Sequence, residues 1–171
     1  NPIIGSDPTG EKVEIESKPV FDIKGNNIGV HTYLKATPDY PEEIHINGLP
    51  QGAKGFTFGG YNSGNENLGL TNKLVKHMGT TETSWDRQTA FEGALKINSM
   101  EIKPPNGQSD TQFINNLGNI FNETDTSKMN YFWHGNVNLP GGFTLYNGNC
   151  NNFSYTMGVK AGVKDQMDKF V

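Results

Sequence analysis

The sequence predicts an α+β domain in which an antiparallel sheet packs against a few helices. Short segments that alternate apolar and polar residues fill the first sixty positions, whereas the clearest helical spacing lies in the second half. Glycine contributes 21 of the 171 residues, and asparagine is equally abundant. Because both residues favour turns and left-handed backbone, we expect short strands joined by ordered loops.

The predicted strands begin near the N-terminus. Alternating apolar residues on both sides of Lys18-Pro19 indicate a strand, a turn and a second strand, with a further turn at residues 25–27. The later candidates are rich in β-branched and aromatic residues or alternate in the same way. These strand candidates are residues 30–37, 43–47, 55–61, 95–102 and 143–146.

Three segments have helical spacing. Residues 67–78 place four apolar side chains at helical intervals, although Gly69 weakens the helix prediction. Ser109 with Gln112 three positions later forms a capping box, which predicts a helix with one core-facing stripe. A third helix should start at Asn151, end near Gly162 and lead into a short amphipathic tail. The stripe of the capped helix consists of Phe113, Ile114, Leu117, Ile120 and Phe121.

Composition excludes several function classes. The formal charge is −4 and the chain has no run of lysine or arginine, which argues against nucleic-acid binding. No stretch approaches the roughly 18 apolar residues of a membrane-spanning helix, so no membrane insertion is expected. One cysteine rules out an internal disulfide and a multi-cysteine zinc site. We expect neither a metal nor a cofactor.

The first ten residues form a turn-prone leader with two prolines and no signal-peptide pattern. Their order, Asn-Pro, a short spacer and Asp-Pro-Thr-Gly, resembles the close of the core repeat in Rhs and related polymorphic toxins. In that family this segment ends the shell and a variable C-terminal toxin follows. The resemblance implies that residues 1–10 are a linker and residues 11–171 a toxin domain.

Cys150 is the candidate nucleophile. It lies where a turn meets a predicted helix, and a helix N-terminus stabilises a thiolate. The flanking residues are polar and turn-forming, which disfavours the alternative of a buried structural thiol. The neighbouring Asn149 and Asn151 could donate hydrogen bonds to an oxyanion, together with the Cys150 backbone N–H.

A cysteine nucleophile needs a general base, and four histidines are candidates. His31 lies in a β-rich segment where a strand would hold its ring, and His45 lies on the next strand candidate. The two histidines are 14 residues apart, a separation that allows two antiparallel strands to bring them together. His77 is interpreted as a solvated helix residue and His134 as a packed structural histidine among aromatic residues.

Three segments carry a family resemblance: Gly-Val-His-Thr at 29–32, Phe-Thr-Phe-Gly-Gly at 56–60, and Tyr-Asn-Gly-Asn-Cys-Asn-Asn-Phe-Ser at 146–154. Together they resemble the PPPDE family of cysteine peptidases, which have a circularly permuted papain-like fold. The resemblance implies that Cys150 is the nucleophile and His31 the base. In the wider permuted papain-like relatives a polar residue on the following strand orients the histidine, which implies His45 here. Residues 62–106 have no recognised counterpart.

These observations predict a Cys–His protease or amidase that is delivered as the toxic tip of an Rhs-type protein, antibacterial or host-directed. The resemblance implies a cognate immunity protein as partner, a protein or peptidoglycan substrate, and action in the cytoplasm or periplasm of a target cell. We expect a monomer. A deamidase or acyl transferase would use the same groups.

Two other classes of function stay open. A non-catalytic binding module on a papain-like scaffold would leave Cys150 unpaired with His31. A metal-dependent hydrolase or nuclease could use His31, His45 and acidic residues, although the chain has no His-x-x-x-His spacing and its acidic balance disfavours a nuclease.

Overall fold

The computed structural model of the chain describes residues 10, 12–21, 24–63, 73–127, 129, 137–139, 143–145 and 149–170. Most of the predicted linker, residues 1–9, lies outside the described residues, as does the aromatic segment with His134. Within the described part, no helix is long and apolar enough to cross a membrane.

The prediction of an α+β fold with an antiparallel sheet is confirmed. Five strands form one sheet in the order β4-β3-β2-β1-β5, and each neighbouring pair is antiparallel. A separate two-stranded sheet pairs β6 with β7. The strands are β1 (Lys12–Phe21), β2 (Asn27–Thr37), β3 (Phe56–Asn62), β4 (Leu74–Thr80), β5 (Asn98–Ile102), β6 (Val137–Leu139) and β7 (Phe143–Leu145).

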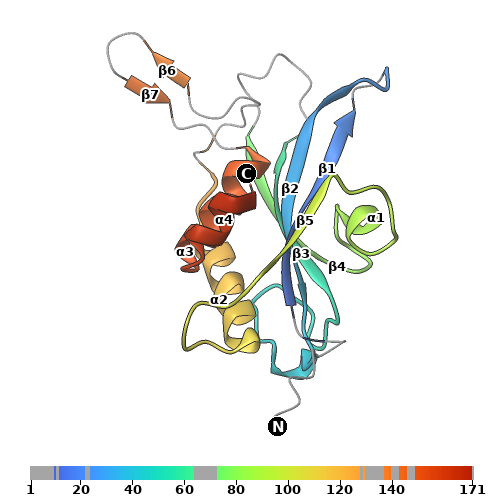
Figure 1. The fold of residues 1–171 in the computed structure, drawn as a ribbon, viewed down its shortest axis with the longest axis vertical. Coiled ribbons are helices and arrows are strands. Elements are labelled where there is room, and N and C mark those ends of the chain that lie inside the picture. Colours follow the sequence, from blue (N-terminus) through green and yellow to red (C-terminus); the bar gives the residue numbers. More distant parts are fainter. Residues whose placement is uncertain are drawn as a thin grey trace.

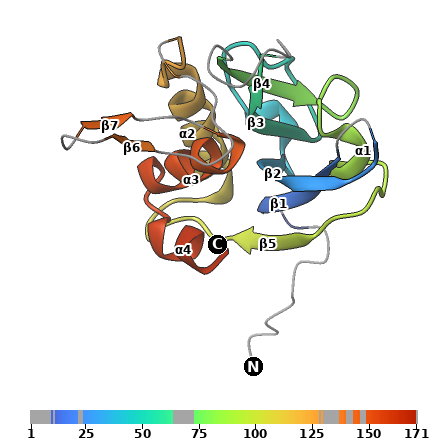
Figure 2. The same cartoon turned by 90° about the horizontal axis from the view of Figure 1, so that it is seen from above.

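The longer helices cover one face of the sheet, and the short helix α1 lies on the other face (Figure 1; Figure 2). This two-layer arrangement buries an apolar core between the sheet and the helix layer. The helical elements are the 3-10 turn η1 (Pro41–Glu43), α1 (Arg87–Ala90), α2 (Asp110–Glu123), α3 (Cys150–Lys160) and α4 (Lys164–Phe170).

The capping box predicted for α2 is present. The Ser109 side chain accepts a hydrogen bond from the Gln112 backbone, and the Gln112 side chain accepts one from the Ser109 backbone. Four residues of the predicted stripe are buried and Ile120 is packed against the core. Phe121 connects the two layers, because its ring lies 5.5 Å from that of Phe58 on β3 and 6.0 Å from that of Phe153 on α3.

Three local predictions are wrong. No turn occurs at Lys18-Pro19: β1 runs through both residues, and Pro19 is tolerated because β5 pairs only with β1 residues up to Ser17. Residues 43–47 are not a strand, since η1 ends at Glu43 and irregular backbone follows. The described part of 67–78 is strand β4 rather than helix, because pairing with β3 outweighs a weak helical spacing.

Candidate functional site

Cys150 is the first residue of α3. The helix begins there because Asn149 caps it: the Asn149 side chain accepts a hydrogen bond of 2.8 Å from the Asn152 backbone N–H. Only 4% of Cys150 is exposed. Its Sγ lies 3.8 Å from the carbonyl oxygen of Val30 on β2 and 3.5 Å from Oδ1 of Asn151. The sulfur is therefore held against the end of β2 that carries His31.

Two contacts fix α3 on the sheet. The Ser154 hydroxyl, one turn after Cys150, donates a 2.9 Å hydrogen bond to the carbonyl oxygen of Thr32. Gly60 on β3 provides the space for close packing, because a Cβ at this position would lie 2.8 Å from Cβ of Phe153. Together they fix the position of the first turns of α3 relative to β2 and β3.

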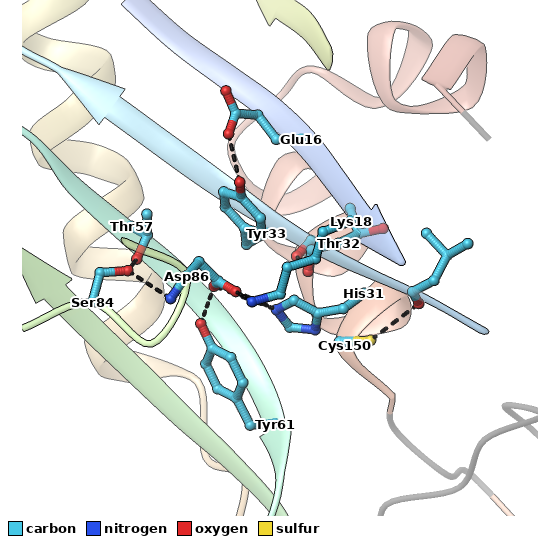
Figure 3. A network of polar contacts seen from close by, with 12 residues as sticks. Glu16, Lys18, His31, Thr32, Tyr33, Thr57, Tyr61, Ser84, Asp86 and Cys150 are labelled. Atoms are coloured by element: carbon cyan, nitrogen blue, oxygen red, sulfur yellow. Dashed lines mark hydrogen bonds and ion pairs between the residues drawn. The ribbon is translucent and has the colours of Figure 1, made fainter. Parts of the chain in front are cut away.

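His31 is buried on β2 with its ring between two partners. Its Nε2 lies 3.1 Å and 3.3 Å from the two carboxylate oxygens of Asp86. The imidazole also interacts with the Cys150 side chain, and the other ring nitrogen lies on the sulfur side (Figure 3). The ring is packed by Tyr61, at 4.8 Å between centroids, and by Tyr33, at 5.9 Å. These contacts restrict the rotation of the imidazole.

Asp86 is fully buried at the entrance to α1 and has three polar partners. Besides His31, its carboxylate contacts Lys18 Nζ at 2.6 Å and accepts a hydrogen bond from the Tyr61 hydroxyl (Figure 3). Asp86 occupies the N-cap position of α1, yet its side chain makes no cap hydrogen bond. Aspartate is a favourable cap residue, so this carboxylate serves tertiary contacts instead of its own helix.

The loop that carries Asp86 is anchored to the sheet by Ser84. The Ser84 hydroxyl lies 2.5 Å from that of Thr57 on β3 and accepts a 3.0 Å hydrogen bond from the Asp86 backbone N–H. Trp85, between Ser84 and Asp86 in the sequence, packs its ring against two others: the centroids lie 4.7 Å from Tyr61 and 4.2 Å from His77 of β4, on which the indole is stacked. Polar and aromatic contacts on both sides therefore hold Asp86 in place.

A second buried carboxylate supports the far side of the site. Glu16 on β1 is fully buried and accepts a 2.6 Å hydrogen bond from the Tyr33 hydroxyl. Lys96 Nζ lies 2.6 Å from the same carboxylate, and Lys35 Nζ lies 3.6 Å from it. This network fixes Tyr33 beside the His31 ring.

The electrostatics favour a charged pair at the centre of the site. Burial by itself lowers the pKa of His31, but hydrogen bonds to Asp86 and Cys150 outweigh it and raise the pKa to about 9. Burial by itself raises the pKa of Asp86, and its interactions with His31 and Lys18 outweigh that effect, so its pKa lies below the ordinary value. At neutral pH the pair is an imidazolium and a carboxylate.

The structure brings together some of the predicted site residues and not others. Cys150 and His31 meet, but His45 is exposed in the loop after η1, where its backbone N–H donates to Asn115 of α2. The strand on which His45 was expected does not form, so the antiparallel pairing that would bring it to His31 is absent. Asp86 occupies the position next to His31 that was predicted for His45.

The predicted oxyanion donors are placed as follows. Asn149 is buried and its side-chain oxygen caps α3, while Asn151 is exposed with its Oδ1 directed to the sulfur. Their role as donors stays a prediction. His77 was expected on a solvated helix; it lies instead on β4, half-buried against Trp85, with Nε2 3.1 Å from the Thr83 carbonyl oxygen.

Sequence reasoning missed Asp86, Lys18 and Tyr61. Asp86 lies 55 residues from His31 in a segment without clear periodicity, and no local motif marks it. Lys18 lies at a position read as a turn, whereas its side chain extends from a continuous strand to Asp86. Among the described residues, no group of three or more His, Cys, Asp or Glu side chains could hold a metal ion.

Comparisons of the chain with models of protein families, with curated proteins and with solved structures found no match. The interpretation of the site therefore depends on its geometry. The site combines a thiol at a helix N-terminus, an imidazole beside it and a carboxylate against the imidazole, which are the three groups that nucleophilic catalysis by a cysteine requires.

Proposed function

We propose that the chain is a cysteine hydrolase of amide bonds, with Cys150 as nucleophile, His31 as general acid and base, and Asp86 as the residue that orients His31. The observation that carries the proposal is the position of the buried His31 ring, in contact with Cys150 on one side and with Asp86 on the other. The imidazole lies between the thiol and the carboxylate, as a residue must that exchanges a proton with the reacting groups while a carboxylate holds its orientation.

The reaction would proceed in two steps. The Cys150 thiolate attacks the amide carbonyl carbon; a C–S bond forms, and the imidazolium of His31 donates its proton to the amine nitrogen as the C–N bond breaks. Water then attacks the thioester while His31 accepts a proton from it. The C–S bond breaks, which releases the carboxylic acid and restores the thiolate.

Burial of the polar groups supports an enzyme rather than a binding module. A fully buried carboxylate and a buried imidazole are costly to desolvate, and a binding surface does not require them. Perturbed titrating groups held beside a nucleophile are typical of active sites. The permuted papain-like arrangement belongs to the same proposal: the histidine strand precedes the helix that presents the cysteine, as in the family that the sequence resembles.

The biological role in the proposal is that of a toxin effector. Its support is the resemblance of residues 1–10 to the end of an Rhs core and of the cysteine segment to permuted papain-like hydrolases. Such an effector would be delivered to a target cell, hydrolyse a protein or a peptidoglycan stem peptide there, and be inhibited in the producing cell by a cognate immunity protein.

The decisive experiment expresses the wild type and Cys150→Ala in bacteria, each with and without a periplasmic targeting sequence. We expect growth inhibition by the wild type in one compartment and none by Cys150→Ala at equal protein level. A peptidoglycan amidase would act only from the periplasm. Thr156→Ala, which changes an exposed residue farther along α3, is the matched control and should remain toxic. Equal toxicity of wild type and Cys150→Ala would contradict the proposal.

A further inference from the structure

A cavity of about 270 Å³ adjoins the candidate nucleophile on the helix-covered side of the sheet. Its walls come from β1 and β2, from the segment that enters β5, and from α3 and α4. The apolar side chains among these walls are Ile15, Val30, Ile97, Met167 and Phe170.

The cavity shares two wall residues with the surroundings of the sulfur. Cys150 Sγ contacts the carbonyl oxygen of Val30 and Oδ1 of Asn151, and both residues line the cavity. Cys150 itself, His31 and Asp86 are not among the lining residues. Because successive residues of a strand face opposite sides of the sheet, the His31 side chain lies on the other face of β2 from Val30 and Thr32, which line the cavity. Val30 and Asn151 therefore connect the surroundings of the sulfur to the cavity, on the side away from the His31 ring.

This placement determines which part of a substrate the cavity faces. His31 must reach the leaving amine to protonate it, so the leaving group lies toward His31. The acyl part of the substrate is bonded to the attacked carbonyl carbon on the other side. It therefore extends from Cys150 toward Val30 and Asn151, which line the cavity.

The size and chemistry of the cavity select an uncharged group. All ten lining residues are uncharged, so a charged side chain would lose its hydration without gaining an ionic partner. Pockets for complete drug-sized ligands have about 300–1,000 Å³. The present cavity is smaller and suits one large side chain, whose apolar surface is removed from water there.

We infer that this cavity is a specificity subsite for a large apolar side chain, such as that of leucine or phenylalanine, on the acyl side of the scissile amide. The inference rests on the proposed function, because it assumes that Cys150 attacks a carbonyl. It specifies which amides are hydrolysed, namely those with a large apolar side chain on the acyl side, which the catalytic groups by themselves do not determine.

The test uses acetyl-aminoacyl chloromethyl ketones that carry leucine, phenylalanine, glycine, aspartate or lysine side chains. Sγ of Cys150 displaces chloride from the reagent, and intact-mass spectrometry follows the rate of this alkylation. We expect the leucine and phenylalanine reagents to react at least tenfold faster than the other three. Rates within twofold for all five reagents would overturn the inference.

A pair of variants links the preference to the cavity wall. Ile97 lines the cavity and is 50% exposed, whereas Leu95 on the same segment is 75% exposed and does not line it. Ile97→Asp should slow the leucine reagent at least tenfold and leave the glycine reagent within twofold, and Leu95→Asp should change neither. An equal effect of both substitutions would contradict the assignment. Ile97→Ala, a milder change, should also reduce the leucine preference.

Iodoacetamide, which has no side chain, separates failure of the inference from failure of the proposed function. Alkylation by iodoacetamide should be much slower in His31→Ala than in the wild type. If it is slower but the five ketones do not differ, only the subsite is wrong. If His31→Ala reacts as fast as the wild type, the proposed catalytic pair is wrong. The subsite inference, which assumes that pair, is then wrong as well.

Discussion

Asp86 binds His31 across 55 residues of sequence, with its Oδ1 3.1 Å and its Oδ2 3.3 Å from the imidazole Nε2. The contact engages one ring nitrogen and leaves the other for Cys150 (Figure 3). Because Asp86 is also held by Lys18 and Tyr61, its carboxylate cannot rotate away from the imidazole without breaking other contacts.

Asp86→Asn should reduce the rate of hydrolysis by about 10²- to 10⁴-fold, and it should also slow the alkylation of Cys150 by iodoacetamide, because a less stable imidazolium stabilises less thiolate. The amide has the shape of the carboxylate but no charge to stabilise the imidazolium, so the pKa of His31 should fall toward neutrality. The imidazole proton signals of His31, followed by NMR against pH, measure that shift. Asp165→Asn on the exposed side of α4 is the control and should leave both measurements unchanged. An unaltered His31 titration in Asp86→Asn would show that the contact has no electrostatic role.

The stability of the fold should depend on pH through His31. The pKa of His31 is about 9 in the folded chain and about 6.5 in the unfolded chain, so the folded state binds the proton more tightly. The contribution to the free energy of unfolding is therefore complete below pH 6.5 and is lost as the pH rises to about 9. Urea unfolding of the wild type should show this decline, on the order of 3 kcal/mol at most.

His31→Gln should abolish that decline between pH 6.5 and 9, whereas His77→Gln should retain it, because no described contact joins His77 to Asp86 or Cys150. A flat profile of the wild type over this range would contradict the prediction, because a His31 that is neutral in the folded protein changes the stability only below pH 6.5. Asp86 contributes in the other direction: its lowered pKa gives stability above the ordinary carboxyl range that is lost in acid.

Lys18→Met should raise the pKa of His31. Lys18 shares the Asp86 carboxylate with His31, so removal of the ammonium leaves the imidazolium as the main cationic partner of a buried carboxylate. We expect a higher pKa of His31 and a stability loss of about 3 kcal/mol, because removing one member of a buried ion pair leaves charge uncompensated. Lys54→Met, at an exposed loop position, is the control. A His31 titration that stays unchanged in Lys18→Met would exclude Lys18 as a positioning residue.

Gly60→Ala should impair the site through packing. The added Cβ would lie 2.8 Å from Cβ of Phe153, so α3 must move away from β3 and carry Cys150 with it. We expect a stability loss of about 1–3 kcal/mol and a slower alkylation of Cys150. Gly107→Ala is a useful comparison: its left-handed backbone makes the substitution costly, but no neighbouring atom lies within 4 Å of the added Cβ. Gly107→Ala should lose stability and keep the alkylation rate.

The sequence by itself predicted several of the local elements and the two side chains of the proposed catalytic pair. A run of β-forming residues predicted β2, alternating aromatic and small residues predicted β3, and the Ser109–Gln112 capping box predicted α2. The polar turn before residue 150 predicted a helix that presents Cys150. These features depend on neighbours within a few residues, which a sequence displays directly.

Only the tertiary structure decided which groups surround His31. Local spacing predicted His45, but that strand does not form, and Asp86 reaches His31 because β3 and β4 carry the following loop to this face. Pro19 led to the prediction of a turn at Lys18, but β1 continues through both residues because β5 does not pair with β1 beyond Ser17. A buried carboxylate is recognisable only after its cationic partners are assembled, because long-range pairing rather than neighbouring residues provides the compensating charge.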